Sequence, residues 1–324
     1  MMTSVVRGLV AGVLCAAAWT AAAPTRALAD EQLEMPPAAF GAPPPDHQPG
    51  SSEYVPGSTP EPRSAAVEGG LPAFITLDRS GTTSHAGIQV GFNKFDGVDL
   101  DDGFAMRFNP YGEYFFPNRI VAIYGQIAVA HLFNFEGDDG TALGNLELGG
   151  LYLPTGDSRL ILRAGLALPT ASDADNLADF AANVGTSYER LTDAVLLAPE
   201  STTLRLSAST IQQFDNFFLR ADGGFDLIFS RPGTAADNAS VFFRANIAAG
   251  IRASGVDFAL ELVNIAALNG DNLDGISERF MHTAAVSVRT HGEDQFQVGA
   301  VFPLDESARG GVWILSLGYM RAFN

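Results

Sequence analysis

The chain has 324 residues, 47% of them hydrophobic and 17% charged, and its formal net charge is −18 at pH 7. A negative charge of this size excludes nucleic acid as an expected partner. The single cysteine, Cys15, lies in an N-terminal segment that we expect to be removed, so neither disulfides nor thiol catalysis is predicted.

The first 70 residues form two segments that we do not expect to contribute to a core. Residues 1–29 have one early arginine, an apolar run and a small-x-small ending at Ala27-Leu28-Ala29, which is the layout of a secretory signal peptide. An uncleaved membrane anchor is disfavoured, because the apolar run is rich in alanine and shorter than the ~20 residues that a span needs. Residues 30–70 are dominated by proline, glycine and serine, which predicts a disordered periplasmic lead.

Alternation of apolar and polar residues is the main signal in the rest of the chain, residues 71–324. In the stretch FFLRADGGFDLIFS (217–230), the odd positions are apolar or glycine, whereas the even positions include Arg220, Asp222 and Asp226. Such alternation predicts a strand, because successive side chains leave a strand on opposite faces. Twelve segments of this kind are predicted near residues 84–95, 102–110, 118–133, 143–153, 158–168, 201–214, 216–230, 240–252, 255–266, 278–290, 294–302 and 310–324.

The connections between these segments alternate in length. Tight turns with favourable residue types are predicted at 154–156, 215–216, 254–255 and 291–293. Long or acidic connections are predicted near 96–101, 134–142, 169–200, 231–239, 267–277 and 303–309. The link 111–117 is an expected exception, being longer and carrying aromatic residues suited to an interface.

Short turns at one end and long loops at the other are typical of a bacterial outer-membrane barrel, whose closed ring leaves no unpaired strand edge in lipid. A soluble, secreted β-sandwich also has alternating strands, but it does not need alternating connection lengths. The predicted fold is therefore all-β: a closed antiparallel transmembrane β-barrel of about 12 strands, with one partly helical long loop, in the bacterial outer membrane.

The final segment, GVWILSLGYMRAFN (311–324), resembles the terminal strand of bacterial outer-membrane barrels, with apolar residues at every second position and an aromatic near the end. It departs from them because Asn324 follows Phe323, and because Arg321 falls on the outward parity, which is tolerable only near lipid headgroups. The resemblance implies insertion by the barrel-assembly machinery through this strand, among outer-membrane lipid and lipopolysaccharide. The segment GLYLPTGDSRLILRAGLALPTA (150–171) also resembles hairpins of outer-membrane channels for hydrophobic or aromatic compounds.

The charged parity of the strands is predicted to face the lumen, because charges that face lipid are costly. Registers estimated from the tight turns place three opposite-charge pairs directly across from each other: Arg205 with Asp226, Arg252 with Asp257, and Glu147 with Arg163. The other inward charges are Asp222, Glu261 and four arginines without a predicted partner, Arg107, Arg220, Arg244 and Arg289. Two interpretations remain open: the charges brace a filled interior, or they create a field that orients solutes in a pore.

The long connections carry most of the acidic residues. They include Asp96, Asp99, Asp101, Asp102, Glu136, Asp138, Asp139, Asp173, Asp175, Asp179, Asp271 and Asp274. These residues are interpreted as solvated loops, with binding of divalent cations at the cell surface as the alternative. The stretch NGDNLDG (269–275) has oxygen ligands but lacks the spacing of a Ca²⁺ loop.

The connection 169–200 differs from the others, because apolar residues recur in it every three or four positions, as on one face of a helix. The residues are Leu177, Phe180, Val184, Tyr188 and Leu191. A connection of this length usually has a function. We predict that it folds into the mouth as a constriction, rather than lying on the rim as a stabilising element.

The case for an enzyme is weak. No GxSxG or HExxH motif occurs, and no serine lies on an outward row beside the outward histidines His131 and His282. We therefore predict no enzymatic activity, catalytic residue, metal centre or cofactor. The predicted function is an outer-membrane, porin-like channel for passive or substrate-selective passage of small solutes. The alternatives are a non-conducting structural or surface-binding barrel with an ion-paired, filled lumen and, third, an outer-membrane lipid-modifying enzyme.

Overall fold

The computed structural model describes residues 74–95, 103–135, 138–156, 159–171, 182, 186–230, 239–269, 280–305, 309 and 311–323. The predicted signal peptide and lead, three residues of the predicted helix face (Leu177, Phe180 and Val184) and most of the acidic loop residues lie outside these ranges. No helix among the described residues is long and apolar enough to cross a membrane.

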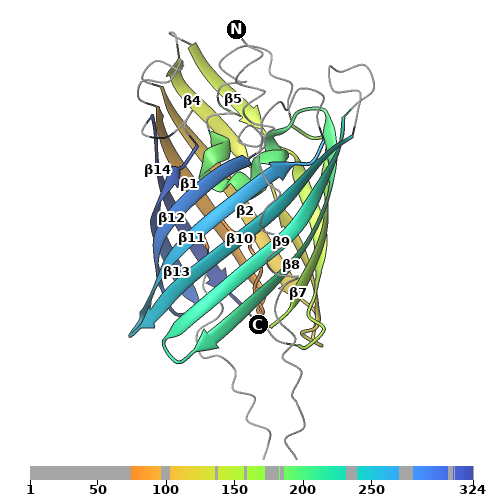
Figure 1. Cartoon of the computed structure of the whole chain (residues 1–324), viewed down its shortest axis with the longest axis vertical. Helices are drawn as coiled ribbons and strands as arrows, with labels where there is room; N and C mark the ends of the chain where they lie inside the picture. Colours follow the sequence, from red (N-terminus) through yellow and green to blue (C-terminus); the bar gives the residue numbers. More distant parts are fainter. Residues whose placement is uncertain are drawn as a thin grey trace, which may run out of the picture.

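The described strands close into one antiparallel ring (Figure 1). The first and last strands, β1 and β14, pair over eleven residues, and β1 also pairs with β2. The strands are β1 His85–Phe95, β2 Phe104–Phe115, β3 Val121–Gln126, β4 Val129–Phe135, β5 Asp138–Leu143, β6 Leu146–Tyr152, β7 Ile161–Leu168, β8 Ser201–Phe214, β9 Phe217–Ser230, β10 Ser240–Ala253, β11 Val256–Ala267, β12 Phe280–Thr290, β13 Asp294–Pro303 and β14 Val312–Ala322.

Fourteen strands occupy twelve positions around the ring, called staves here, because two staves are each interrupted. Strand β5 lies mostly within residues 134–142, which were wrongly predicted as a connection. β3 and β4 both pair with β2, on either side of a break at residues 127–128. β5 and β6 are likewise separated by Gly144 and Asn145. A Cβ at position 144 would lie 2.9 Å from the carbonyl oxygen of Leu196 and 3.0 Å from that of Ala128, so a glycine is needed at this break. The predicted count of twelve is confirmed.

The tight turns fix the register as predicted at two of three places. Arg205 lies opposite Asp226 and Arg252 lies opposite Asp257. The third register was wrong, because Arg163 lies opposite Leu151. Strand β6 ends at Tyr152 and strand β7 begins at Ile161, so the connection between them is longer than the predicted turn at 154–156.

The predicted exception at 111–117 was also wrong. Strand β2 continues to Phe115, and a short turn follows in which the Phe116 amide donates to the Val121 carbonyl and the Arg119 amide donates to the Phe116 carbonyl. The tight hairpins and the C-terminus therefore share one end of the barrel, here called the short-turn end (Figure 1). Arg321, the outward arginine, lies there with its side chain 63% exposed and its Nε 3.9 Å from Asp294.

The outer surface of the ring is apolar. Aliphatic side chains such as Ile247 and Leu260 are 57% and 58% exposed at mid-height, as expected of a face that meets lipid. Aromatic side chains are exposed towards both ends: Tyr114, Phe214 and Phe296 near the short turns, and Phe104, Phe133 and Phe229 near the long connections. Two such girdles are a feature of transmembrane barrels.

The interior of the ring is filled by two stretches of chain. The first is the inner segment, residues 74–80, whose residues Phe74, Ile75 and Leu77 are at most 4% exposed. The second is the inner loop, residues 186–197, which ends in the 3-10 helix η1 (Tyr188–Leu197) and is drawn in green inside the barrel in Figure 1. The helix predicted from Tyr188 and Leu191 is therefore present in its described part, with non-helical backbone at Arg190.

Candidate functional site: the filled lumen

The backbone amides and carbonyls of the inner segment are bound by side chains rather than by a neighbouring strand. Its amides at Ile75 and Thr76 donate to the Glu261 carboxylate of β11, at 2.9 and 2.8 Å, and the Thr76 hydroxyl donates to the same group at 2.7 Å. On the other side, Arg190 of the inner loop donates to the carbonyls of Ile75 and, at 2.6 Å, Leu77. One carboxylate and one guanidinium thus satisfy a buried backbone that would otherwise cost free energy.

The side chain of Asp78 lies in a basic part of the wall. Its Oδ1 accepts a hydrogen bond from Arg244 Nη1 of β10 at 2.6 Å, and its Oδ2 accepts one from the Ser207 hydroxyl of β8 at 2.9 Å. Arg205 Nη2 is 4.0 Å from Oδ1. Burial raises the pKa of this carboxyl, but Arg244, Arg163 and Arg205 together outweigh it and lower the pKa below its usual range. Asp78 is therefore an ionised anchor.

Two further wall arginines bind the backbone on either side of this anchor. Arg220 Nη2 of β9 donates to the Asp78 carbonyl at 2.6 Å, and Arg163 Nη1 of β7 donates to the Arg79 carbonyl at 2.8 Å. The Arg220 guanidinium also lies 4.7 Å from the centre of the Phe74 ring. Four neighbouring strands, β7 to β10, therefore each contribute one arginine to the same short stretch of the inner segment.

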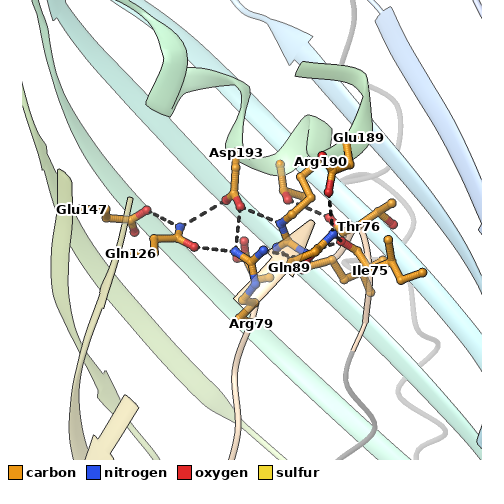
Figure 2. Close-up of polar contacts among 12 residues, drawn as sticks. Ile75, Thr76, Arg79, Gln89, Gln126, Glu147, Glu189, Arg190 and Asp193 are labelled. Atoms are coloured by element: carbon orange, nitrogen blue, oxygen red, sulfur yellow. Dashed lines mark hydrogen bonds and ion pairs between the residues drawn. The ribbon is translucent and has the colours of Figure 1, made fainter. Parts of the chain in front are cut away.

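The inner segment and the inner loop meet at Arg79 and Asp193 (Figure 2). Arg79 Nη1 lies 3.1 Å from Asp193 and 2.6 Å from Gln126, and Arg79 Nη2 donates to Gln89 at 2.7 Å. Arg190 Nε donates to the same Asp193 carboxylate at 2.7 Å. The Asp193 carboxylate thus joins the loop to the segment and, through Gln126, to the wall.

The wall also carries ion pairs of its own. Arg205 contacts Glu147 at 2.5 Å and Asp226 at 3.2 Å, and Asp226 is 3.0 Å from Arg244. Glu147 also lies 3.2 Å from Arg163, although the two residues are not directly opposite each other. The Arg163–Glu147 contact therefore forms despite the wrong register: Glu147 lies opposite Ala167, four residues along β7 from Arg163, and the two side chains reach each other along the lumen.

The four inward arginines without a predicted partner all have one. Arg244 contacts Asp78, Arg220 contacts Asp222 at 2.7 Å, and Arg289 contacts Asp257 at 2.7 Å. Arg107 donates to the carbonyl of Thr186 in the inner loop at 3.3 Å. The short-turn end holds a separate cluster, in which Asp257 also meets Arg252 and His291.

Four charged residues in the lumen had no signal in the sequence. Asp78, Arg79, Arg190 and Asp193 lie outside the alternating strands, so strand parity could not assign them a direction. The closest signal was composition: the stretch FITLDR combines apolar residues with an acid and a base after a proline-rich region.

Little space is left inside. A cavity of about 40 Å³ remains beside the inner segment towards the short-turn end, lined by residues that include Asp78, Arg79, Tyr111 and Arg220. That volume accommodates water but not a solute of more than a few atoms. Among the described residues, no group of three or more His, Cys, Asp or Glu side chains could hold a metal ion.

Comparison with known proteins identifies the fold. No protein-family model and no curated protein matches the chain. The COG4313 outer membrane channel from Pseudomonas putida F1 matches with a TM-score of 0.54 and 13% identity, over 78% of this chain and 99% of that chain. The KdgM porin matches with a TM-score of 0.39 and 13% identity, over 74% and 99%. LpxR from Salmonella typhimurium matches with a TM-score of 0.40 and 9% identity, over 73% and 100%.

Proposed function

We propose that this outer-membrane-type barrel is a channel for small polar solutes that the inner segment and the inner loop keep closed. The observation that carries the proposal is that the lumen is occupied by separate stretches of chain, rather than by the wall's own side chains alone. An eight-stranded barrel is just wide enough for its side chains to fill, and the diameter grows with strand number. Twelve staves therefore leave a space that residues 74–80 and 186–197 occupy.

The contacts of the inner segment are of a kind that water can replace. Its backbone and Asp78 are bound mainly by hydrogen bonds and ion pairs to Glu261, Arg190, Arg220 and Arg244. Intramolecular hydrogen bonds are exchanged for hydrogen bonds to water at a limited net cost, about 1.5–3 kcal/mol each where one partner is charged. Release would also expose Phe74, Ile75 and Leu77, which pack in apolar clusters with the wall, but the strands of the ring pair with each other and not with the segment.

A deletion tests the proposal. Conductance in planar bilayers is measured for refolded protein starting at residue 30, for the same protein lacking residues 30–70, and for protein lacking residues 30–80. The first two keep the inner segment and are expected to be closed most of the time. The third is expected to show long-lived, discrete conductance steps, because the inner segment is gone.

Insertion and folding are checked by the heat-dependent gel mobility of the barrel. Folded, inserted protein that lacks residues 30–80 and stays silent would contradict the channel and would favour a non-conducting barrel. That second function has its own support, because the wall's ion pairs among Arg205, Glu147 and Asp226 would persist without the inner segment.

An enzyme is the third candidate. The polar partners of the described histidines are the Thr83 carbonyl and Glu113 for His85, Thr141 for His131, Asp305 for His282 and Asp257 for His291. None of these contacts is to a serine, and a fold does not by itself decide activity.

The surroundings follow from the same proposal. We expect outer-membrane lipid and lipopolysaccharide around the apolar belt, divalent cations at the acidic connections, and the barrel-assembly machinery at strand β14. The predicted signal peptide would direct export across the inner membrane.

A further inference from the structure

We propose that Asp78 occupies a carboxylate subsite of the barrel wall, and that a solute carrying a carboxylate competes with Asp78 and thereby releases the inner segment. The subsite consists of Arg163, Arg205, Ser207 and Arg244. The inference rests on the proposed channel and adds its solute class and its mode of opening.

The subsite is formed by the wall alone. Ser207 and Arg205 lie on β8, Arg163 on β7 and Arg244 on β10, and the ring holds these strands in place through long, regular registers. None of the four side chains belongs to the inner segment or the inner loop. The subsite therefore remains assembled when Asp78 leaves it.

The charge of this part of the wall favours an anion. Strands β6 to β10 carry four buried arginines at this level, Arg163, Arg205, Arg220 and Arg244, but only three buried carboxylates, Glu147, Asp222 and Asp226. Without Asp78, Arg244 keeps only Asp226, a carboxylate that it shares with Arg205. A buried charge needs a partner, and Asp78 supplies it in the closed state.

The geometry favours a carboxylate over a spherical anion. Arg244 and Ser207 bind different oxygens of Asp78, at 2.6 and 2.9 Å, so the two donors are spaced for a planar group with two oxygens. A solute carboxylate reproduces both contacts with its two oxygens, whereas chloride offers the two donors a single acceptor atom.

Occupation of the subsite also affects the neighbouring contacts. Arg220 and Arg163 bind the carbonyls of Asp78 and Arg79, which are adjacent in the chain to the displaced side chain. A solute in the subsite forces Asp78 away, and these two carbonyls must move with it. The segment is then left with its contacts to Glu261 and to the inner loop.

A cysteine reporter measures release without relying on conductance. Ser80 is 7% exposed and its hydroxyl has no hydrogen-bond partner among the described residues, so Ser80→Cys is a conservative change. Protein refolded from residue 30 onward has no other cysteine, because Cys15 is the only one in the chain. The rate of reaction with a water-soluble maleimide then reports how often the inner segment leaves the lumen.

Acetate at fixed ionic strength is the probe, and chloride is the reference anion. Acetate is expected to increase the labelling rate several-fold in a saturable way, whereas chloride is not. Asp78→Asn should label about ten- to a hundredfold faster without acetate, because charge-assisted hydrogen bonds are lost. Arg244→Gln should need more acetate for the same increase, whereas Arg289→Gln, an equally buried inward arginine paired with Asp257, should respond like the parent.

Three results would overturn the inference. They are a labelling rate that acetate does not change, an acetate response that survives Arg244→Gln unaltered, and an equal response to inorganic phosphate, which would remove the preference for carboxylates. Failure of the channel itself looks different, because protein lacking residues 30–80 would then be silent while Ser80→Cys labelling still responded to acetate.

Discussion

The two halves of the inner wall have different roles. Strands β6 to β10 face the lumen with buried arginines and carboxylates, which bind the inner segment and each other. The inward positions of β13, β14 and β1 carry no Asp, Glu, Lys or Arg, and several are very small, including Gly91, Gly299 and Ser316. The first half attaches the inner stretches of chain through charged side chains, whereas the second makes room for them and contacts them through neutral groups such as Gln89.

The half formed by β13, β14 and β1, here called the small half, fits closely against the inner segment and the inner loop. A Cβ at Gly91 would lie 1.7 Å from a carboxylate oxygen of Glu189 in the inner loop, and a Cβ at Gly299 would lie 2.0 Å from the Ile75 side chain in the inner segment. Both distances are far below a van der Waals contact, so the chain inside the barrel is packed to protein density against these strands. The comparison shows that attachment and fit are separate properties, which can be changed one at a time.

Breaking the attachment should have the largest effect. Arg205→Met removes the partner of Glu147, Asp193 and Asp226 at once, and is expected to lower the free energy of unfolding by about 3–5 kcal/mol, because buried carboxylates lose their counter-charge. Urea unfolding in lipid vesicles, followed by gel mobility, measures it. Leu206→Met, the next residue on the lipid face, is the control, and an equal loss in both would disprove the assignment.

Disturbing the fit between the wall and the inner loop should have the second largest effect. Gly91→Leu is expected to displace Glu189 and the inner loop, at a cost of about 1–3 kcal/mol for overpacking, while leaving the ring intact. Labelling of Ser80→Cys should then be faster than in the parent. Gly223→Leu is the matched change, because a Cβ there would meet only the Arg244 carbonyl oxygen, at 3.9 Å. If Gly91→Leu labels no faster than Gly223→Leu, the small half is not needed for fit.

Glu261→Gln sharpens the comparison, because it weakens one attachment of the inner segment while keeping the size and shape of the side chain. The amides of Ile75 and Thr76 would lose a charged acceptor, which is worth about 1 kcal/mol more than a neutral one. Labelling of Ser80→Cys is expected to increase roughly fivefold, which is what such an energy corresponds to. Glu293→Gln, in an exposed turn, should leave the rate unchanged, and the reverse order of the two variants would contradict the assignment.

The smallest effect is expected outside the lumen. Arg321→Ala removes an exposed arginine 3.9 Å from Asp294, and exposed ion pairs contribute about 0–1 kcal/mol. The free energy of unfolding in vesicles should therefore change little. A loss as large as that of Arg205→Met would mean that the lumen is not where the polar stabilisation lies.

The sequence could predict the wall but not its contents, for a physical reason. Strand parity and the turns at 215–216 and 254–255 are local, and they were enough to place Arg205 opposite Asp226 and Arg252 opposite Asp257. The pairing of Arg163 failed because the connection after Tyr152 is longer than its turn residues indicate. The position of residues 74–80 depends on a ring that closes only when β14 meets β1, and no local pattern encodes that.

The structure of the inner loop could be predicted in part. Tyr188 and Leu191 recur at helical spacing, and the structure has a helical turn there. The backbone departs from a helix at Arg190, whose side chain binds the carbonyls of the inner segment. The departure occurs where a distant partner competes with the local preference, which periodicity alone cannot reveal.

The short link between the inner segment and the wall governs how the barrel would reclose. Only residues 81–84 separate Ser80 from the start of β1, and four extended residues span at most about 14 Å. A released segment therefore stays near its binding site, at an effective concentration on the order of millimolar for so short a tether. A competing solute must match that concentration, scaled by its affinity, so such a barrier would respond to abundance as well as to chemical identity.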